Sequence, residues 1–532
     1  MSDVRSILYV FLPCRPVYPL GVTYLADAVH RKYPDIRQQI LDLSLIPQAH
    51  RRKTFLAQLR QFDPDLVCFS WRDIQVFAPH EGDPSLKYAF NFYYSTNPIK
   101  RLTASIKGLG YLWTYYRGIQ DILSYFWTVH RQFPGKRILV GGGAFSVFAD
   151  QLIHQLPEGT IGLLGEGEDL MLKVIEGKDL TDERSILRKG ARVFRGTKTA
   201  ITSIQDMTIN LPYLTSIFPQ HVSYKNDCVG VQSKRGCPYD CQFCEYPYIE
   251  GKRVRYRAPE RVVQDILQHY QQWGTRNFWF TDAQFITGSE ALPQCNELLD
   301  RIIAEKLELT WSGYIRTSLI TPELAGRMVR SGVGDLEVAI TSGSQAVLNE
   351  LHMGFRLDNL YDGCRYLKEA GFAGKLILNY SLNSPGDTEA TLMESVASYK
   401  KIAAILGEDR VYPMLFFLGV QPHTGFEQRL IQEGYLSGGY NPLSLNPITI
   451  KKMLYNPPPL SNLIARACLR AWDKTAWELA SPAGRSVHEL YADESLFRGV
   501  VENAGRDVLI NLEQDLLARG VGRTIGRAED LP

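Results

Sequence analysis

The first 185 residues carry two alternating patterns of hydrophobic and polar positions. Short, nearly continuous apolar runs such as residues 6–12 are typical of parallel strands that are buried on both faces. Longer segments between them place apolar residues at helical spacing, as in residues 22–32. The expected strands cover residues 6–12, 37–43, 65–70, 137–140 and 160–164. Strands that alternate with helices predict a doubly wound α/β sheet, with ligands at the carboxyl ends of the strands.

The same rhythm of strands and helices returns after Gly230. Here the expected strands cover residues 229–233, 277–281, 308–315, 335–341, 375–382 and 410–418. Six parallel strands at this spacing, separated by helices, predict a partial (βα)6 barrel. Four parts are therefore expected: an α/β domain at 1–185, a linker at 186–225, the barrel at 226–440 and a small helical C-terminal region at 441–532.

Residues 88–133 interrupt the α/β pattern with a high density of aromatic side chains. They hold 13 aromatics, about 28% of the segment, against 11% for the whole chain. Within an insertion expected at about 75–133, these rings can form a helical core of their own, or they can line an apolar pocket. Because the segment follows the third strand, at the ligand edge of the sheet, the second interpretation predicts a large apolar or planar substrate.

Composition and charge narrow the class of protein. The 59 basic and 57 acidic residues leave a net charge of +2 and no basic stripe, which disfavours a nucleic-acid partner. No apolar run reaches the roughly 18 residues of a membrane-spanning helix. The N-terminus lacks the zones of a signal peptide, and nine cysteines at uneven spacing are no disulfide framework. These features predict a cytoplasmic protein.

Three cysteines, Cys237, Cys241 and Cys244, lie within eight residues directly after a predicted strand. Thiolates at such spacing select zinc or an iron–sulfur cluster. A structural zinc ion needs a fourth protein ligand, and no nearby Cys or His lies at zinc spacing. A [4Fe–4S] cluster usually takes four cysteines, so three would leave one iron open to a small-molecule ligand. The triad therefore favours a catalytic cluster over a structural metal site.

The C-x-x-x-C-x-x-C spacing resembles that of the radical S-adenosylmethionine (SAM) superfamily, in which the open iron binds SAM and SAM is split to a 5′-deoxyadenosyl radical. Weaker motifs extend the resemblance over about residues 229–440. It implies SAM contacts at Phe243, Asp282, Arg316, Glu337, Ser342, Asn379, Pro385 and Gly386. Many relatives carry an acidic residue where this chain has Thr341. Glu337 lies four residues earlier on the same strand face and could replace it, or Thr341 could hydrogen-bond instead.

The first 185 residues resemble a cobalamin-binding Rossmann-like domain. The resemblance implies cobalamin contacts at Gly21, Gly141, Gly142, Gly143, Gly165, Glu166, Gly167 and Glu168. Glycines after strands let a large planar ligand approach the backbone. The D-x-H-x-x-G signature is absent from the sequence, so no histidine ligand to cobalt is expected from that motif. Residues 70–74 and 76–94 also resemble a cyanobacterial subgroup named for photosystem II high-light acclimation.

Together, the two resemblances imply an enzyme with a [4Fe–4S] cluster, SAM and cobalamin, most simply a methyltransferase acting on an unactivated centre of a hydrophobic small molecule. An electron donor of the flavodoxin or ferredoxin type is implied with it. A cobalamin-dependent radical cyclase or rearrangement enzyme is the alternative, and a non-catalytic sensor or assembly factor is the third. The methylthiotransferase branch is disfavoured, because it would need three N-terminal cluster cysteines and only Cys14 and Cys68 are available.

Overall fold

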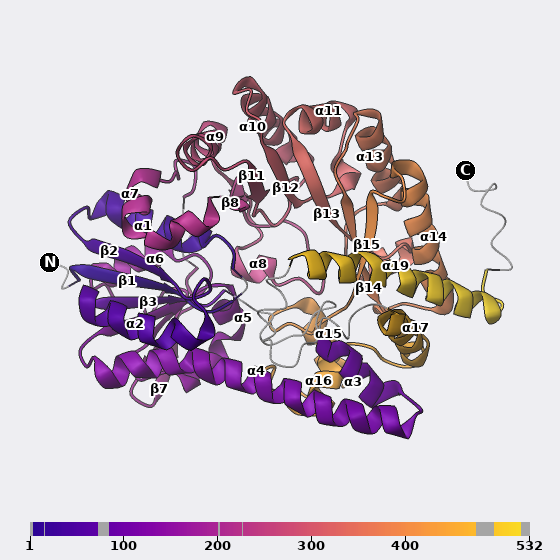
Figure 1. The fold of residues 1–532 in the computed structure, drawn as a ribbon, viewed down its shortest axis with the longest axis horizontal. Coiled ribbons are helices and arrows are strands. Elements are labelled where there is room, and N and C mark those ends of the chain that lie inside the picture. The colour runs from indigo at the N-terminus through magenta and orange to yellow at the C-terminus, as the bar shows by residue number, and fades with distance from the viewer. Residues whose placement is uncertain are drawn as a thin grey trace.

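Two sheets lie side by side along the long axis of the molecule, each flanked by helices (Figure 1). The structure is a computed structural model that describes residues 4–14, 16–72, 84–199, 203–225, 227–474 and 494–522. The expected fold class is confirmed: a Rossmann-like α/β unit is followed by a partial barrel and a C-terminal helical region.

The first sheet has the strand order β2-β1-β3-β4-β5-β6-β7. Its parallel strands are β1 (Ser6–Phe11), β2 (Arg37–Asp42), β3 (Leu66–Ser70), β4 (Arg137–Gly141) and β5 (Ile161–Leu163). Its flanking helices are α1 (Leu20–Lys32), α2 (Gln48–Phe62), α5 (Gly143–Leu152) and α6 (Glu168–Ile175). Every side chain of β1 is buried, which accounts for its apolar sequence. The order reverses between β1 and β3, and doubly wound sheets bind ligands at the carboxyl edge beside such a reversal.

Two more strands extend this sheet into the segment expected to be a linker. β6 (Ser185–Lys189) and β7 (Arg192–Arg195) form an antiparallel hairpin, and β6 also pairs with β5. Gly190 turns the hairpin with φ +61°, a conformation that favours glycine. The hairpin is short, basic and partly exposed, as sheet edges often are, so it lacks the apolar run by which the buried strands are recognised.

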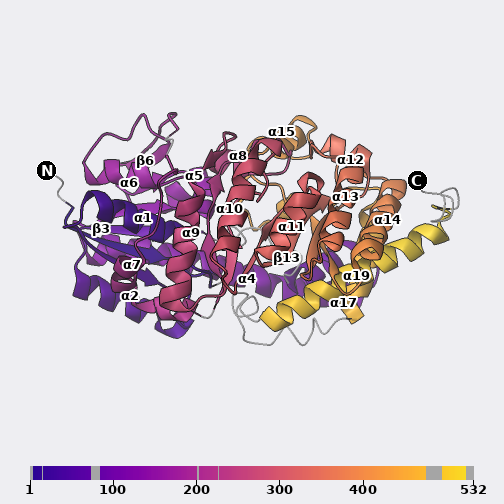
Figure 2. The same ribbon diagram turned by 90° about the horizontal axis from the view of Figure 1, so that it is seen from above.

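The second sheet has six parallel strands in the order β15-β14-β13-β12-β11-β8. They are β8 (Val229–Val231), β11 (Asn277–Phe280), β12 (Thr310–Tyr314), β13 (Val333–Thr341), β14 (Leu376–Leu382) and β15 (Val411–Phe417). Figure 2 shows the outer layer of helices: α9 (Pro259–Gln268), α10 (Leu292–Ala304), α11 (Pro322–Arg330), α13 (Leu357–Glu369) and α14 (Glu389–Leu406). All the strands expected in both units are present, with ends within two residues of the expected ones.

The two sheets share one hydrophobic core. This core includes Ile7 and Tyr9 of β1, Leu211 and Leu214 of α7 (Leu211–Ile217), and Phe278 of β11. Helix α7 therefore connects the packing of the two units. Because the two units bury side chains in a common core, the folded chain fixes their relative placement, and no flexible linker sets it.

The aromatic insertion is a helical hairpin of α3 (Pro84–Tyr94) and the long α4 (Pro98–Gln132). The C-terminal half of α4 packs on the first sheet, where Tyr125 and Phe126 contact the rings of Phe55 and Phe69. The N-terminal half and α3 extend beneath the second sheet along one edge of the molecule (Figure 1). Residues 73–83, which include the start of the expected insertion and part of the 70–74 and 76–94 motifs, lie outside the described residues.

Within its described residues, the C-terminal region contains α16 (Pro447–Met453), α17 (Ser461–Lys474) and α19 (Glu494–Ala518). Helices α17 and α19 pack on each other, and α19 packs on β15 and α14. Among the helices in the described ranges, none is both long and apolar enough to cross a membrane.

Candidate active site

The three clustered cysteines lie on one loop between β9 (Lys234–Arg235) and α8 (Tyr246–Ile249). The loop turns at Gly236, with φ +93°, and a Cβ there would stand 2.3 Å from the carbonyl oxygen of Arg253. Two backbone hydrogen bonds hold the loop at Gln242: Gln242 N–H donates to the Leu351 carbonyl, and Phe426 N–H donates to the Gln242 carbonyl. The loop is therefore held by a close contact with a nearby segment and by hydrogen bonds with segments that are distant in the sequence.

The thiols of Cys237, Cys241 and Cys244 are close enough to influence one another electrostatically. Burial raises the pKa of all three above that of a free thiol. A cationic metal centre is what would favour their thiolate forms. No three His, Cys, Asp or Glu side chains in the described ranges are arranged to hold a single metal ion. Three thiols on one loop fit the donor set of an open iron–sulfur cluster.

Arg316 follows β12 and reaches the cysteine loop. Its Nη2 lies 3.7 Å from Cys241 Sγ, and its guanidinium stacks on Tyr239, 3.4 Å from the ring centroid. The guanidinium also lies 5.5 Å from the centroid of the Phe355 ring, and Arg316 is only 8% exposed. The structure thus places Arg316, the arginine of the third-strand motif, directly beside the triad. Its apolar surrounding strengthens the electrostatic interactions of the guanidinium.

Asp282 follows β11. Its carboxylate binds the residues that precede the cysteine loop and is not open to the loop itself. Its carboxylate accepts from Ser233 N–H at 2.7 Å, Lys234 N–H at 3.1 Å and Lys234 Nζ at 3.0 Å. Both side chains of the ion pair are at most 1% exposed. Burial alone would lower the pKa of Lys234, but Asp282 outweighs it and the pKa is raised. With its oxygens occupied, Asp282 positions the strand end from which the cysteine loop starts.

Other predicted SAM contacts divide into two groups. Phe243 packs on an apolar cluster that includes Val347 and Phe426, beneath the loop. Glu337 lies next to Tyr314 on the neighbouring strand and is the main reason that the pKa of that phenol is raised. The buried Oδ1 of Asn379 has no hydrogen-bond partner in the described part of the chain. Glu337 and Asn379 lie on the neighbouring strands β13 and β14.

The remaining predicted contacts shape turns. Ser342 is buried and accepts from Ser344 N–H at 3.1 Å. Pro385 is buried, and Gly386 has φ +83° in the turn after β14. Thr341 is fully buried with φ +65°, a conformation that a β-branched residue rarely adopts, and its Oγ1 has no partner among the described residues. Such strain clusters at functional sites.

The carboxyl edge of the first sheet faces this loop. Gly165, after β5, has φ +70°, and a Cβ there would stand 2.6 Å from the Ile249 carbonyl oxygen at the end of α8. Glu168 pairs with Arg235 at 2.6 Å, and Glu166 pairs with Arg255 of β10 (Arg255–Tyr256). The Gly-Glu-Gly-Glu turn therefore joins the two units, with its carboxylates engaged by arginines rather than open to a ligand.

The other glycines predicted to contact cobalamin lie along or near the same edge. Gly142 has φ +103°, and a Cβ there would stand 2.5 Å from the Trp71 carbonyl oxygen, so the chain passes closely between β3 and α5. Gly141 ends β4, and Gly143 begins α5. Gly21 lies exposed in the first turn of α1, and Gly167 packs against Leu25.

Several residues that lie around the cysteine loop were not predicted from the sequence. Arg235 and Arg255 bind the first sheet, and Tyr239 supports Arg316. Burial raises the pKa of Glu250 to about 7, although Gly236 N–H donates to its Oε2 at 2.9 Å. These residues come close together because β9 pairs with β10. Strands of two residues carry no recognisable pattern of apolar and polar positions in the sequence.

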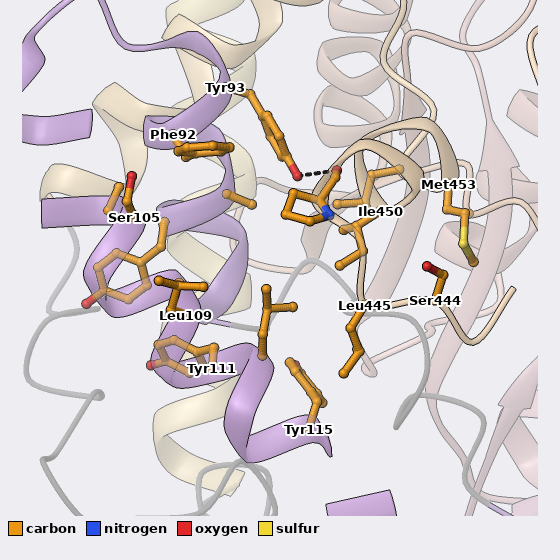
Figure 3. Close-up of a pocket in the computed structure, with 18 of the residues that line it drawn as sticks. Phe92, Tyr93, Ser105, Leu109, Tyr111, Tyr115, Ser444, Leu445, Ile450 and Met453 are labelled. Carbon is orange, nitrogen blue, oxygen red and sulfur yellow. Dashed lines mark hydrogen bonds between the residues drawn. The ribbon is translucent and has the colours of Figure 1, made fainter. Parts of the chain in front are cut away.

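A separate apolar cavity of about 320 Å³ lies between the aromatic hairpin and the barrel (Figure 3). Tyr88, Phe92, Tyr93, Tyr111 and Tyr115 contribute from α3 and α4. Across it stand α16 and the end of β15, and Tyr93 Oη donates to the Pro447 carbonyl at 2.6 Å. The C-terminal rings of the aromatic segment are therefore core, and its N-terminal rings line a pocket, while the apolar substrate stays a prediction.

Comparison with known proteins places these features in a family context. The sequence profile of the radical SAM superfamily matches residues 231–398. The hopanoid C-3 methylase of Methylococcus capsulatus is 23% identical over 264 residues, 47% of this chain and 39% of that protein. The anaerobic magnesium-protoporphyrin IX monomethyl ester cyclase of Synechocystis is 24% identical over 242 residues, 44% of this chain and 47% of that protein. The chain thus spans less than half the length of these curated relatives.

The whole fold also has a close structural counterpart. The radical SAM methyltransferase TsrM from Kitasatospora setae, solved with tryptophan and a SAM analogue, superimposes with a TM-score of 0.65 and 15% identity, over 97% of this chain and 99% of that chain. A second structure of TsrM contains cobalamin and a [4Fe–4S] cluster, at a TM-score of 0.61. At this level of identity, the similarity shows that the fold is shared.

Proposed function

We propose that this chain, which carries a radical SAM domain at residues 231–398 on a fold shared with a radical SAM methyltransferase solved with cobalamin bound, is a cobalamin-dependent radical SAM methyltransferase. It would act on an unactivated centre of a hydrophobic small molecule. The observation that carries this proposal is that the cysteine loop lies against the carboxyl edge of the Rossmann-like sheet. Such an edge is where a doubly wound sheet holds its ligand, so the two cofactors would lie close to each other.

In this proposal, Cys237, Cys241 and Cys244 hold the cluster. A cluster with one open iron supplies a 5′-deoxyadenosyl radical from SAM, and cobalamin supplies the transferable methyl group. Arg316 places a positive charge beside Cys241. Phe243 and the apolar cluster below it keep water from the loop.

Acceptor groups at the barrel mouth would orient SAM. Asn379 Oδ1, which has no hydrogen-bond partner among the described residues, and the Glu337 carboxylate lie on the neighbouring strands β14 and β13. Carboxylate and amide oxygens suit the amino and ribose hydroxyl groups of SAM. Glu337 would then take the role that an acidic residue at position 341 has in many relatives. Gly141, Gly142 and Gly143 would leave the first sheet's edge open to cobalamin.

The apolar cavity supports a hydrophobic substrate, because pockets bury most of a ligand's surface against side chains of matching polarity. Reduction of the cluster would require a flavodoxin- or ferredoxin-type donor. None of the nine cysteines, all of which lie in the described ranges, forms a disulfide; this fits a reducing compartment, and we place the protein in the cytoplasm.

The test is anaerobic reconstitution with iron, sulfide and cobalamin, followed by product analysis with SAM and apolar lipids or pigment precursors. Replacing Cys237, Cys241 or Cys244 by Ala should abolish the cluster's absorption and SAM cleavage. Cys228→Ala is the matched control, because Cys228 is partly exposed on the same chain segment and should leave both unchanged. Full iron content and activity in any one triad variant would contradict the cluster assignment.

The same assay separates methyl transfer from radical cyclisation, which the similarity to the anaerobic cyclase favours as a second candidate. A methyltransferase forms both 5′-deoxyadenosine and S-adenosylhomocysteine. A cyclase or rearrangement enzyme forms 5′-deoxyadenosine without S-adenosylhomocysteine. Cofactor binding with no SAM turnover under any condition would indicate a sensor or assembly factor instead.

A further inference from the structure

The N-terminal half of α4 exposes a continuous apolar stripe. Its members recur at alternating spacings of three and four residues, so they lie on one face of the helix. They are Ile99, Leu102, Ile106, Leu109, Trp113 and Tyr116, and their exposed fractions run from 43% to 74%. Soluble surfaces seldom carry so many large apolar side chains in one row, and such patches mark interaction sites.

The charged side chains of the segment that carries the stripe have a single sign. Between Pro84 and Gln120 the chain has five basic residues and no acidic one. Lys100 pairs with Asp473 of α17, while Lys107 and Arg117 lie over the rings of Tyr88 and Trp113. A helix with an apolar face, interfacial Trp and Tyr rings and only cationic charges has the composition of a segment that lies in the plane of a membrane surface.

The stripe also adjoins the apolar cavity. Leu109 is 65% exposed to solvent and at the same time lines the cavity. Helix α16, on the other side of the cavity, exposes 70% of Ile448 and carries Lys451 and Lys452. An apolar molecule dissolved in a bilayer would therefore meet the cavity next to the surface on which α4 rests.

We propose that the outer face of α4 from Ile99 to Tyr116 docks the protein on an anionic lipid bilayer, with the helix parallel to the membrane plane. This goes beyond the proposed catalytic function and does not depend on it. A second copy of the chain is the other possible occupant of such a stripe. Two copies would bring their cations together, and like charges across an interface oppose association, whereas anionic headgroups complement them.

The test is cosedimentation of the full chain with vesicles of phosphatidylcholine, with or without phosphatidylglycerol. Binding to the anionic vesicles should be strong at low ionic strength and should weaken as salt is added. Ile99→Ser, Ile106→Ser and Trp113→Ser combined should weaken it by about tenfold or more. Lys107→Glu with Arg117→Glu should weaken it by roughly 30-fold or more, at about tenfold per 1.4 kcal/mol and about 1 kcal/mol per basic residue.

The matched control is Val222→Ser, Ile510→Ser and Leu517→Ser combined, because these side chains are also 42% to 56% exposed but lie elsewhere. This variant should bind vesicles like the natural chain, and circular dichroism should show that all variants are folded. Absence of binding to anionic vesicles, or equal binding to neutral ones, overturns the proposal. A dimer that the stripe variant converts to monomer, without vesicle binding, would assign the face to a second copy. Loss of catalysis alone changes neither outcome, since binding is measured directly.

Discussion

Arg316 shows how one side chain can influence the proposed cluster without ligating it. Its charge lies 3.7 Å from Cys241 Sγ and is held by the ring of Tyr239. A nearby positive charge favours the more negative, reduced form of a cluster. Its position beside the triad is one that the sequence motif predicted, because the residue follows a strand whose carboxyl end must lie at the barrel mouth.

Arg316→Ala should leave the iron content of the reconstituted protein unchanged, lower the reduction potential of the cluster and slow SAM cleavage by about tenfold or more. Arg316→Lys should recover only part of this, because an ammonium group lacks the planar stacking of a guanidinium. Redox titration followed by electron paramagnetic resonance measures the potential. An unchanged potential in Arg316→Ala would contradict the role.

Asp282→Asn should destabilise the protein by about 3–5 kcal/mol, because it leaves the ammonium of Lys234 buried without its carboxylate. Adding Lys234→Met should recover part of the loss, since no buried charge then remains. Glu297→Gln breaks the exposed pair with Arg301 and should cost less than about 1 kcal/mol. Denaturant unfolding of the three variants measures these differences. A loss as small as that of Glu297→Gln would show that the Asp282 pair is unimportant for stability.

At the scale of elements, the buried strands were predictable because burial on both faces forces an apolar run. The 6–12 segment shows this, because β1 lies there and all of its side chains are buried. The strand pairs β6–β7 and β9–β10 were not, because such short strands are stabilised by pairing and by tertiary ion pairs rather than by their own composition. The position of the three cysteines on one loop was predictable from their spacing. The engagement of Glu166 and Glu168 by arginines was not, since it depends on a contact between distant segments.

Gly165→Ala and Gly177→Ala separate backbone strain from a contact between elements. The two glycines have nearly the same φ, +70° and +68°, but only at Gly165 would a Cβ meet a backbone atom, the Ile249 carbonyl oxygen. Gly177→Ala should cost about 1 kcal/mol. Gly165→Ala should cost clearly more and should also impair reconstitution, because α8 must move from the edge of the first sheet. Equal unfolding energies for the two variants would show that this contact is not tight.

At the scale of the whole molecule, the ion pairs Glu168–Arg235 and Glu166–Arg255 hold the two units together across the proposed cofactor site. The radius of gyration measured by small-angle scattering should therefore stay the same when SAM and cobalamin are added. Glu166→Gln with Glu168→Gln should increase it, because two arginines lose their partners at a shared boundary. Contraction of the natural chain on adding the cofactors would show a closing motion instead.

The shared core has a consequence for how the chain is made. Ile7 and Tyr9 emerge early during synthesis, but part of the core around them is completed only by α7 and by strands of the second unit. The nascent N-terminal unit therefore exposes apolar surface until more than half of the chain has been translated, and in that interval it is open to aggregation. A truncated N-terminal unit would carry the same exposed surface throughout its life.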